Sequence, residues 1–243
     1  MATKVESLNT KDVETHPQTR EAYLPVGKDV KCHTFHWTRA NPIYKLEGTV
    51  ATHRGGGEKP YTAVIGDLEL LPNTGKHYFE YRINTDNCRI GFCTSSAYGT
   101  GKELNDREFG TVPPKADSTP NTPTYLQTIG AVAPPEKSSV AAYMEVQTAK
   151  AYVNGQFKKQ LWRLFVASSG ATFGFVVDTN LGVVQLFVDK VYQGLLFDES
   201  CNLKGVRLCP CVGIAGMDMH NRNIGECNLN VKVHDVKTFD GVY

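Results

Sequence analysis

The chain has 243 residues, of which 41 % are hydrophobic, and its 26 basic residues nearly balance its 25 acidic ones. This length suits one large all-β domain or two small domains, and the apolar content supports a sizeable core. Balanced charge argues against a general nucleic-acid binder, so we expect no nucleic-acid partner. No apolar run approaches the ~18–20 residues that span a bilayer, so we expect no membrane partner.

Residues 1–30 are polar and poor in apolar side chains, which predicts an N-terminal arm rather than a core element. The stretch lacks the apolar core of a signal peptide, and Glu6, Asp12 and Glu14 argue against a transit peptide. The seven cysteines show no disulfide-framework spacing, which favours reduced thiols. We therefore expect a cytoplasmic protein.

From residue 30 the chain reads as short strand-like segments separated by turn residues. The first half offers residues 33–37, 43–46, 50–52, 61–65, 68–71, 77–83 and 89–93. The clearest alternation lies in 77–83, where Tyr78, Glu80 and Arg82 fall on the face opposite His77, Phe79 and Tyr81. Many short strands at regular spacing predict a sandwich or a barrel.

Residues 112–139 interrupt this pattern. They hold six of the 12 prolines: Pro113, Pro114, Pro120, Pro123, Pro134 and Pro135. Because proline cannot donate to a strand ladder, this segment cannot be regular sheet throughout. It predicts a long Pro-rich insertion, and loops beyond ~12–15 residues in a compact domain are usually functional or disordered.

Strand signals resume after the insertion, at residues 140–145, 150–153, 173–177, 183–188, 209–214 and 227–233. Asn154-Gly155 is a strong hairpin-turn signal. Residues 157–166 form the one helix candidate of any length, and their apolar positions fit a turn or a strand as well. Gly91 and Gly174 interrupt strand interiors, which predicts close approach at those points.

Three ordered blocks resemble the SPRY domain family. They are GKHYFEYRI at 75–83, RIGFC at 89–93, and FGFVVD at 173–178 followed by GVVQLFV at 182–188 and GLLF at 194–197; LCPCV at 208–212 fits a further strand. The resemblance implies an all-β, bent antiparallel two-sheet β-sandwich, a concanavalin-like jelly roll, over residues 31–243. Asp189-Lys190 stands where the family has Asn-Gly, and this departure predicts another form of turn because Lys190 and Val191 are poor at positive φ.

The resemblance also implies protein–protein recognition, since family members serve as ubiquitin-ligase substrate receptors, chromatin-complex subunits, calcium-channel modules and axonemal components. We expect a non-enzymatic structural or scaffolding subunit of a large hetero-complex, with a cytoskeletal or ciliary location as the narrower expectation. The alternatives are a substrate-recognition adaptor for ubiquitin transfer, which lacks a RING-like cysteine and histidine spacing here, and a chromatin-complex subunit. A hydrolase using Asp218 and His220 is remote, because no nucleophile elbow is present.

The predicted partner-binding residues are aromatic or arginine residues near loops, the types that dominate interface energetics: Arg54, Tyr61, Tyr98, Tyr125 and Trp162. Core positions are the alternative for Tyr61 and Trp162. The loops, the Pro-rich insertion and the N-terminal arm are expected to contact protein partners.

We expect no cofactor and no metal. Cys209 and Cys211 would share one face of a strand, as buried thiols, and no further ligands have zinc-site spacing. The sequence GTGK at 99–102 is followed by Glu103 where a phosphate loop needs Ser or Thr.

Overall fold

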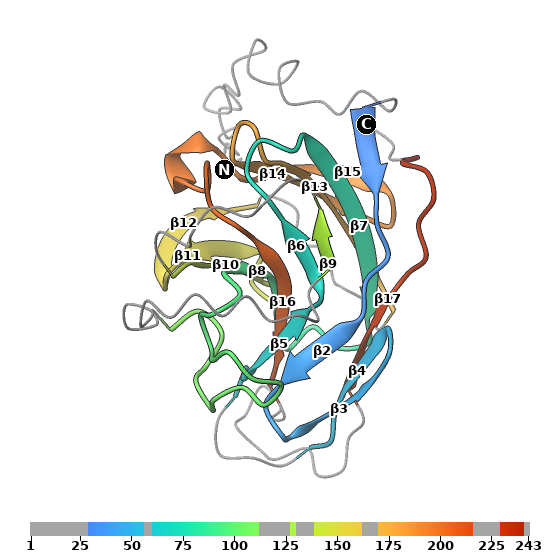
Figure 1. The fold of residues 1–243 in the computed structure, drawn as a ribbon, viewed down its shortest axis with the longest axis vertical. Coiled ribbons are helices and arrows are strands. Elements are labelled where there is room, and N and C mark those ends of the chain that lie inside the picture. Colours follow the sequence, from blue (N-terminus) through green and yellow to red (C-terminus); the bar gives the residue numbers. More distant parts are fainter. Residues whose placement is uncertain are drawn as a thin grey trace, which may run out of the picture.

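Two sheets face each other and enclose the core of the protein (Figure 1). The computed structural model describes residues 29–55, 60–111, 127–129, 139–161, 170–215 and 229–240, with backbone alone for 127–129. Nearly all of the predicted arm and of the Pro-rich insertion lies outside these residues, as do Tyr125, Trp162, Asp218 and His220. In the described part of the chain, no helix is long and apolar enough to cross a membrane.

The first sheet, sheet A, has eight strands. Its order is β15 (Val191–Phe197), β14 (Val183–Val188), β13 (Thr172–Asp178), β7 (Lys76–Ile83), β17 (Leu229–Val233), β4 (Val50–His53) and β3 (Tyr44–Glu47), with β1 (Val30–Cys32) beside β7. All of its pairs are antiparallel except β1 with β7, which run parallel. β1 and β17 share one edge of β7, since β1 pairs with its beginning and β17 with its end.

The second sheet, sheet B, has seven strands and is antiparallel throughout. Its order is β12 (Gln156–Gln160), β11 (Lys150–Val153), β10 (Ala141–Glu145), β8 (Cys88–Cys93), β16 (Cys209–Ile214), β5 (Ala63–Gly66) and β2 (Trp37–Ala40). A separate parallel pair joins β6 (Leu68–Leu70) to β9 (Gln127–Ile129), and one 3-10 turn, η2, spans Glu199–Cys201. The predicted two-sheet antiparallel sandwich is confirmed.

For residues 157–166 the strand alternative holds over the described part, because Gln156–Gln160 form β12, and the described residues hold no α-helix. Two other sequence-based expectations about local structure are wrong. The strand expected over 33–37 begins only at Trp37, while Val30–Cys32 forms an unexpected strand. The turn at Asp189 and Lys190 does take positive φ at both residues (48° and 66°), the backbone that an Asn-Gly turn would adopt.

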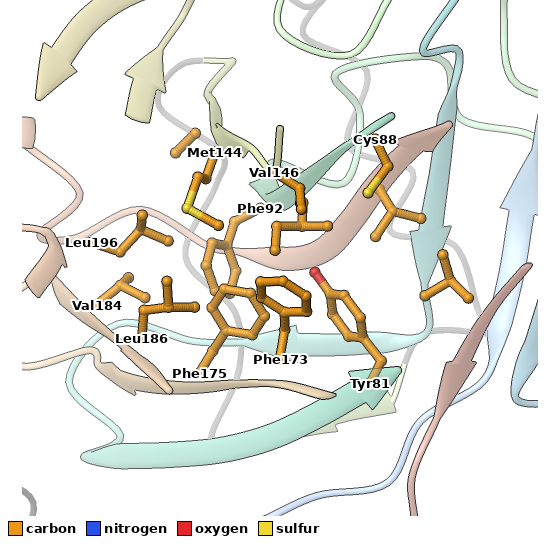
Figure 2. Packing of buried hydrophobic residues seen from close by; sticks show 14 of the residues in the cluster. Tyr81, Cys88, Phe92, Met144, Val146, Phe173, Phe175, Val184, Leu186 and Leu196 are labelled. Carbon is orange, nitrogen blue, oxygen red and sulfur yellow. The ribbon is translucent and has the colours of Figure 1, made fainter. Parts of the chain in front are cut away.

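The main core lies between the sheets and is rich in aromatic rings (Figure 2). Phe175 on β13 is fully buried, and its ring centroid lies 5.5 Å from those of Tyr81 and Phe92. Alternation along β7 and β8 produces this packing, because Phe79, Tyr81 and Phe92 all point inward. The alternation predicted for 77–83 is therefore confirmed.

Both sheets are also covered on their outer faces. On sheet B, the segment 95–111 lays Tyr98, Leu104 and Phe109 over a second apolar cluster that includes Cys209 and Cys211. These two cysteines are fully buried thiols, as predicted. The predicted close approach at Gly91 is confirmed, since a Cβ there would lie 2.1 Å from the carbonyl oxygen of Ala142.

Candidate protein-contact surface

Aromatic side chains cross the outer face of sheet B in register. Tyr143 on β10 pairs with Tyr152 on β11, and Tyr152 pairs with Phe157 on β12. The Tyr143 and Tyr152 rings stack with centroids 5.1 Å apart and planes 12° apart, while Phe157 meets Tyr152 edge to face at 5.9 Å. Directly opposed aromatic pairs of this kind stabilise a sheet and order its surface.

Arg89 on β8 extends this line toward Tyr61. Its guanidinium carbon lies 4.3 Å from the ring centroid of Tyr61 and 4.9 Å from that of Tyr143, so it is held between two π faces. The hydroxyl of Tyr61 donates to Asn87 Oδ1 at 2.6 Å, and this hydrogen bond fixes the orientation of the Tyr61 ring. We call Tyr61, Arg89, Tyr143, Tyr152 and Phe157 the aromatic row.

Two carboxylates accompany the aromatic row, and both are paired with Arg89. Glu108 Oε1 lies 2.5 Å from Nη1 and Glu145 Oε1 lies 3.2 Å from Nη2 of Arg89. Nη1 also donates to the carbonyl oxygen of Phe109 at 2.8 Å. Glu145 Oε2 accepts from the hydroxyls of Thr148 and Tyr152, so its second oxygen is satisfied too. The Arg89 guanidinium therefore offsets one of the two carboxylate charges, and the centre of the row keeps a net negative charge.

Exposure rises along the aromatic row toward the edge of sheet B. Tyr143 is only 4 % exposed and Tyr152 is half-buried, whereas Phe157 is 56 % exposed. In the described part of the chain, the other exposed large hydrophobic residue is Val191, on β15 of sheet A. The exposed ring of Phe157 adjoins the half-buried ring of Tyr152, so the two form one continuous aromatic surface at the edge of sheet B.

The hairpin that carries Phe157 is tightly specified by its turn. Asn154 and Gly155 both have positive φ (50° and 75°), as expected for the two-residue turn that an Asn-Gly pair favours. Asn154 Oδ1 accepts from the amide of Ala141 at 2.8 Å, and the Asn154 amide donates to the Ala141 carbonyl at 2.7 Å. The predicted hairpin turn is confirmed, and it anchors the exposed ring to the body of sheet B.

The segment 95–111 supports the row from the side. The guanidinium of Arg39, itself fully buried, donates to the carbonyl oxygens of Ser95, Gly99 and Gly101. Near the other end of the segment, the Gly110 amide donates to the hydroxyl of Tyr98 at 2.9 Å. Gly110 lies against Tyr143, because a Cβ at Gly110 would come within 2.3 Å of that ring.

The predicted partner-binding residues have different positions in the structure. Tyr61 is half-buried and belongs to the aromatic row. Tyr98 is 0 % exposed and packs within the outer cluster of sheet B, so the expectation that its side chain faces a partner is wrong for this surface. Arg54 is exposed, directly after β4, and none of the described contacts joins it to the row. Tyr125 and Trp162 lie outside the described residues.

Sequence reasoning missed four members of the row: Arg89, Tyr143, Tyr152 and Phe157. A signal for two of them exists, because an Asn154-Gly155 turn fixes the register in which Tyr152 and Phe157 face each other. The expectation of a possible helix over 157–166 concealed this pairing. Arg89 carries no such signal, since its partners come from segments distant in the sequence.

The tyrosines of the row are uncharged. Burial raises the pKa of Tyr61, Tyr143 and Tyr152, so all three stay neutral phenols across the physiological range. The described residues contain no group of three or more His, Cys, Asp or Glu side chains that could hold a metal ion. The surface therefore offers π faces, hydroxyls and a rigid apolar edge.

The fold has clear relatives among solved structures. The SPRY domain of human HERC1 superposes with a TM-score of 0.53 at 14 % identity, covering 84 % of this chain and 98 % of that one. The PSpry domain of TRIM65 is similar at a TM-score of 0.48 and 15 % identity, covering 85 % of this chain and 94 % of that one. No family model and no curated protein matches the sequence. The comparison with HERC1 confirms a SPRY-like fold, as the sequence blocks predicted.

Proposed function

We propose that this chain is a non-enzymatic protein-interaction module that uses the aromatic row on sheet B as its contact surface. The observation that carries the proposal is the 56 % exposed ring of Phe157 at the end of a line of ordered aromatic side chains. Aromatic and arginine side chains dominate the energetics of protein interfaces. The SPRY-like fold supports the proposal by analogy alone, because one fold hosts many functions.

Preorganisation supports this choice of surface. The edge-to-face contact with Tyr152 and the Asn154-Gly155 turn hold Phe157 in place before a partner arrives. Binding of a partner to this ring therefore costs little further conformational entropy in the side chains of the row. Tyr61 at the other end of the row is half-buried and would lie at the rim of such an interface.

We further propose that the module serves as a structural subunit of a larger cytoplasmic assembly, with a cytoskeletal or ciliary complex as the narrower form. Two things support this proposal. The described residues hold no group of three or more His, Cys, Asp or Glu side chains that could bind a metal ion, and four members of the row, Arg89, Tyr143, Tyr152 and Phe157, lie on paired strands of sheet B. Such a surface suits a lasting contact.

Affinity purification of the tagged full-length protein tests both proposals. Wild type, Phe157→Ser and Val191→Ser are compared, because Val191 is the matched exposed apolar residue on the other sheet. We expect one or a few proteins at amounts comparable to the bait, retained by Val191→Ser and reduced by at least ~10-fold by Phe157→Ser. Equal recovery with all three proteins would contradict the assigned surface. Recovery of a ubiquitin-ligase scaffold or a chromatin complex would replace the structural-subunit role.

A further inference from the structure

The outer face of sheet A carries an aromatic notch that is separate from the aromatic row. Its floor is formed by Tyr78 on β7, Val176 on β13 and Phe187 on β14, all at most 2 % exposed. Tyr192 on β15 and the residues of β1 line its sides. We call this set of residues the notch.

Residues 234–240, near the end of the chain, fill the notch. The Phe239 ring meets Tyr78 edge to face with centroids 4.8 Å apart, and it meets Phe187 in the same way at 5.2 Å. Val236 packs into the same cluster. The next residue, Asp240, forms an ion pair with Lys190 in the β14–β15 turn. The Phe239 ring thus lies on the aromatic floor of the notch, and the adjacent Asp240 carboxylate pairs with the Lys190 ammonium beside it.

The segment is held by side chains far more than by its backbone. The His234 amide donates to the Glu80 carbonyl at 3.1 Å, but within the described part of the chain no backbone–backbone hydrogen bond involves residues 236–240. β1, which borders the same notch, is instead fixed by a ladder with β7. Segments with few backbone hydrogen bonds and few buried contacts open at low free energy. Phe239 and Val236 are only half-buried, consistent with such a segment.

We propose that the notch is a docking site for an extended segment of a partner protein that carries an aromatic residue followed directly by an acidic residue. Phe239 and Asp240 occupy the site in cis and define what it recognises. The aromatic floor accepts a ring edge-on, as Tyr78 and Phe187 do now. The exposed ammonium of Lys190 selects a carboxylate at the following position.

The charges around the notch agree with this specificity. The Glu80 carboxylate accepts from the Tyr78 hydroxyl through Oε2 at 2.9 Å, and its Oε1 lies 3.3 Å from Nδ1 of His234 in the same segment 234–240. Lys190 is exposed beside the notch, and its ammonium becomes available to an incoming carboxylate once Asp240 leaves. The covalently attached segment competes at a high effective concentration, so a partner segment binds weakly to the closed protein.

Binding of a labelled synthetic peptide with the sequence of residues 234–240 to the full-length protein tests the proposal by fluorescence anisotropy. Phe239→Ala removes the ring from the cis segment, so we expect the peptide to bind this variant at least ~10-fold more tightly than wild type. A peptide with alanine in place of the phenylalanine should not bind. Lys190→Glu should weaken binding, and a peptide with lysine at the last position should restore it.

Several results would overturn the inference. Equal peptide binding to wild type and Phe239→Ala would mean that the notch is not the site. A Phe239→Ala protein that binds no peptide, whether it unfolds at a lower temperature or is fully folded, would make residues 234–240 a fixed part of the fold. A wild-type dimer that Phe239→Ala dissolves would assign the notch to a second copy of the chain. The Phe157→Ser variant should bind the peptide normally, so failure of the contact surface on sheet B leaves this test intact.

Discussion

Glu69 and Arg207 form an ion pair that is almost completely buried. Glu69 Oε1 lies 2.5 Å from Arg207 Nη2, and the two side chains are 0 % and 8 % exposed. The pair joins β6 to the residues just before β16, next to the backbone bridge between Leu70 and Leu208. A buried pair contributes little relative to apolar packing, but a single unpaired buried charge is very costly.

Replacing Arg207 by methionine is therefore expected to destabilise the protein by about 3–5 kcal/mol, because it leaves the Glu69 carboxylate buried without its cation. The double variant Glu69→Leu/Arg207→Met should recover most of this loss. Urea unfolding followed by circular dichroism measures both. A double variant as unstable as the single one would show that packing of the arginine stem, and not the stranded charge, carries the effect.

The inward faces of the strands were predictable from sequence because alternation is a local signal. Phe79 and Tyr81 lie in the core as the period of two along β7 requires. The Asp189 turn was not predictable in this way. Its backbone is set by the register of β14 with β15, and Asp189 Oδ1 accepts from the Thr172 amide, so tertiary contacts overcome the poor local preference of Lys190 for positive φ.

The outer faces could not be predicted, since what covers them comes from distant parts of the chain. Tyr78 and Glu80 point away from the core, as alternation predicts, yet both are buried by residues 234–240. Tyr98 is of a residue type that is common at protein interfaces, but its side chain is buried and packs against Phe109 of the same segment. Arg89 belongs to the candidate surface only because Tyr61 and Glu108 approach it from elsewhere in the sequence.

His33 and His77 form a neutral, hydrogen-bonded pair beside β1. The Thr74 hydroxyl donates to the Leu71 carbonyl, so Thr74 Oγ1 must accept from Nε2 of His77, at 2.8 Å. Nδ1 of His77 is then an acceptor and receives a hydrogen bond from Nε2 of His33, at 3.0 Å. Burial is the main cause that lowers the pKa of both rings to about 4; the charge of Lys31 contributes to both shifts, and His33 contributes to that of His77.

This pair predicts a loss of stability in mild acid. The unfolded rings take up protons near pH 6.5 and the folded rings only near pH 4, so stability falls as pH decreases between these values. For fully buried His77 the loss is on the order of 2 kcal/mol. His77→Gln should show a shallower decline in its urea midpoint from pH 7 to pH 4.5. Parallel declines in the two proteins would contradict the assignment.

Arg89 should be irreplaceable by lysine. A single ammonium cannot contact Glu108, Glu145 and the Phe109 carbonyl together while stacking between two rings, as the guanidinium does. We expect Arg89→Lys to lower the free energy of unfolding by about 1–2 kcal/mol. Glu108→Gln, at the more exposed partner, should cost less than about 1 kcal/mol. Thermal unfolding measures the stability of both variants. A larger loss of stability in Glu108→Gln than in Arg89→Lys would contradict the central role given to Arg89.

Gly110 offers a test of how the aromatic row is held in place, and Gly205 provides the matched control. Both have positive φ (107° and 79°), so alanine strains the backbone at either site by about 1 kcal/mol. Only at Gly110 would the new Cβ meet a side chain, the ring of Tyr143 at 2.3 Å, whereas the space at Gly205 is open. We expect Gly110→Ala to cost a further 1–3 kcal/mol or so and to change the near-ultraviolet circular dichroism of the tyrosines. Equal losses and unchanged tyrosine signals in both variants would mean that the ring of Tyr143 moves aside freely, and that the segment 95–111 does not fix the row.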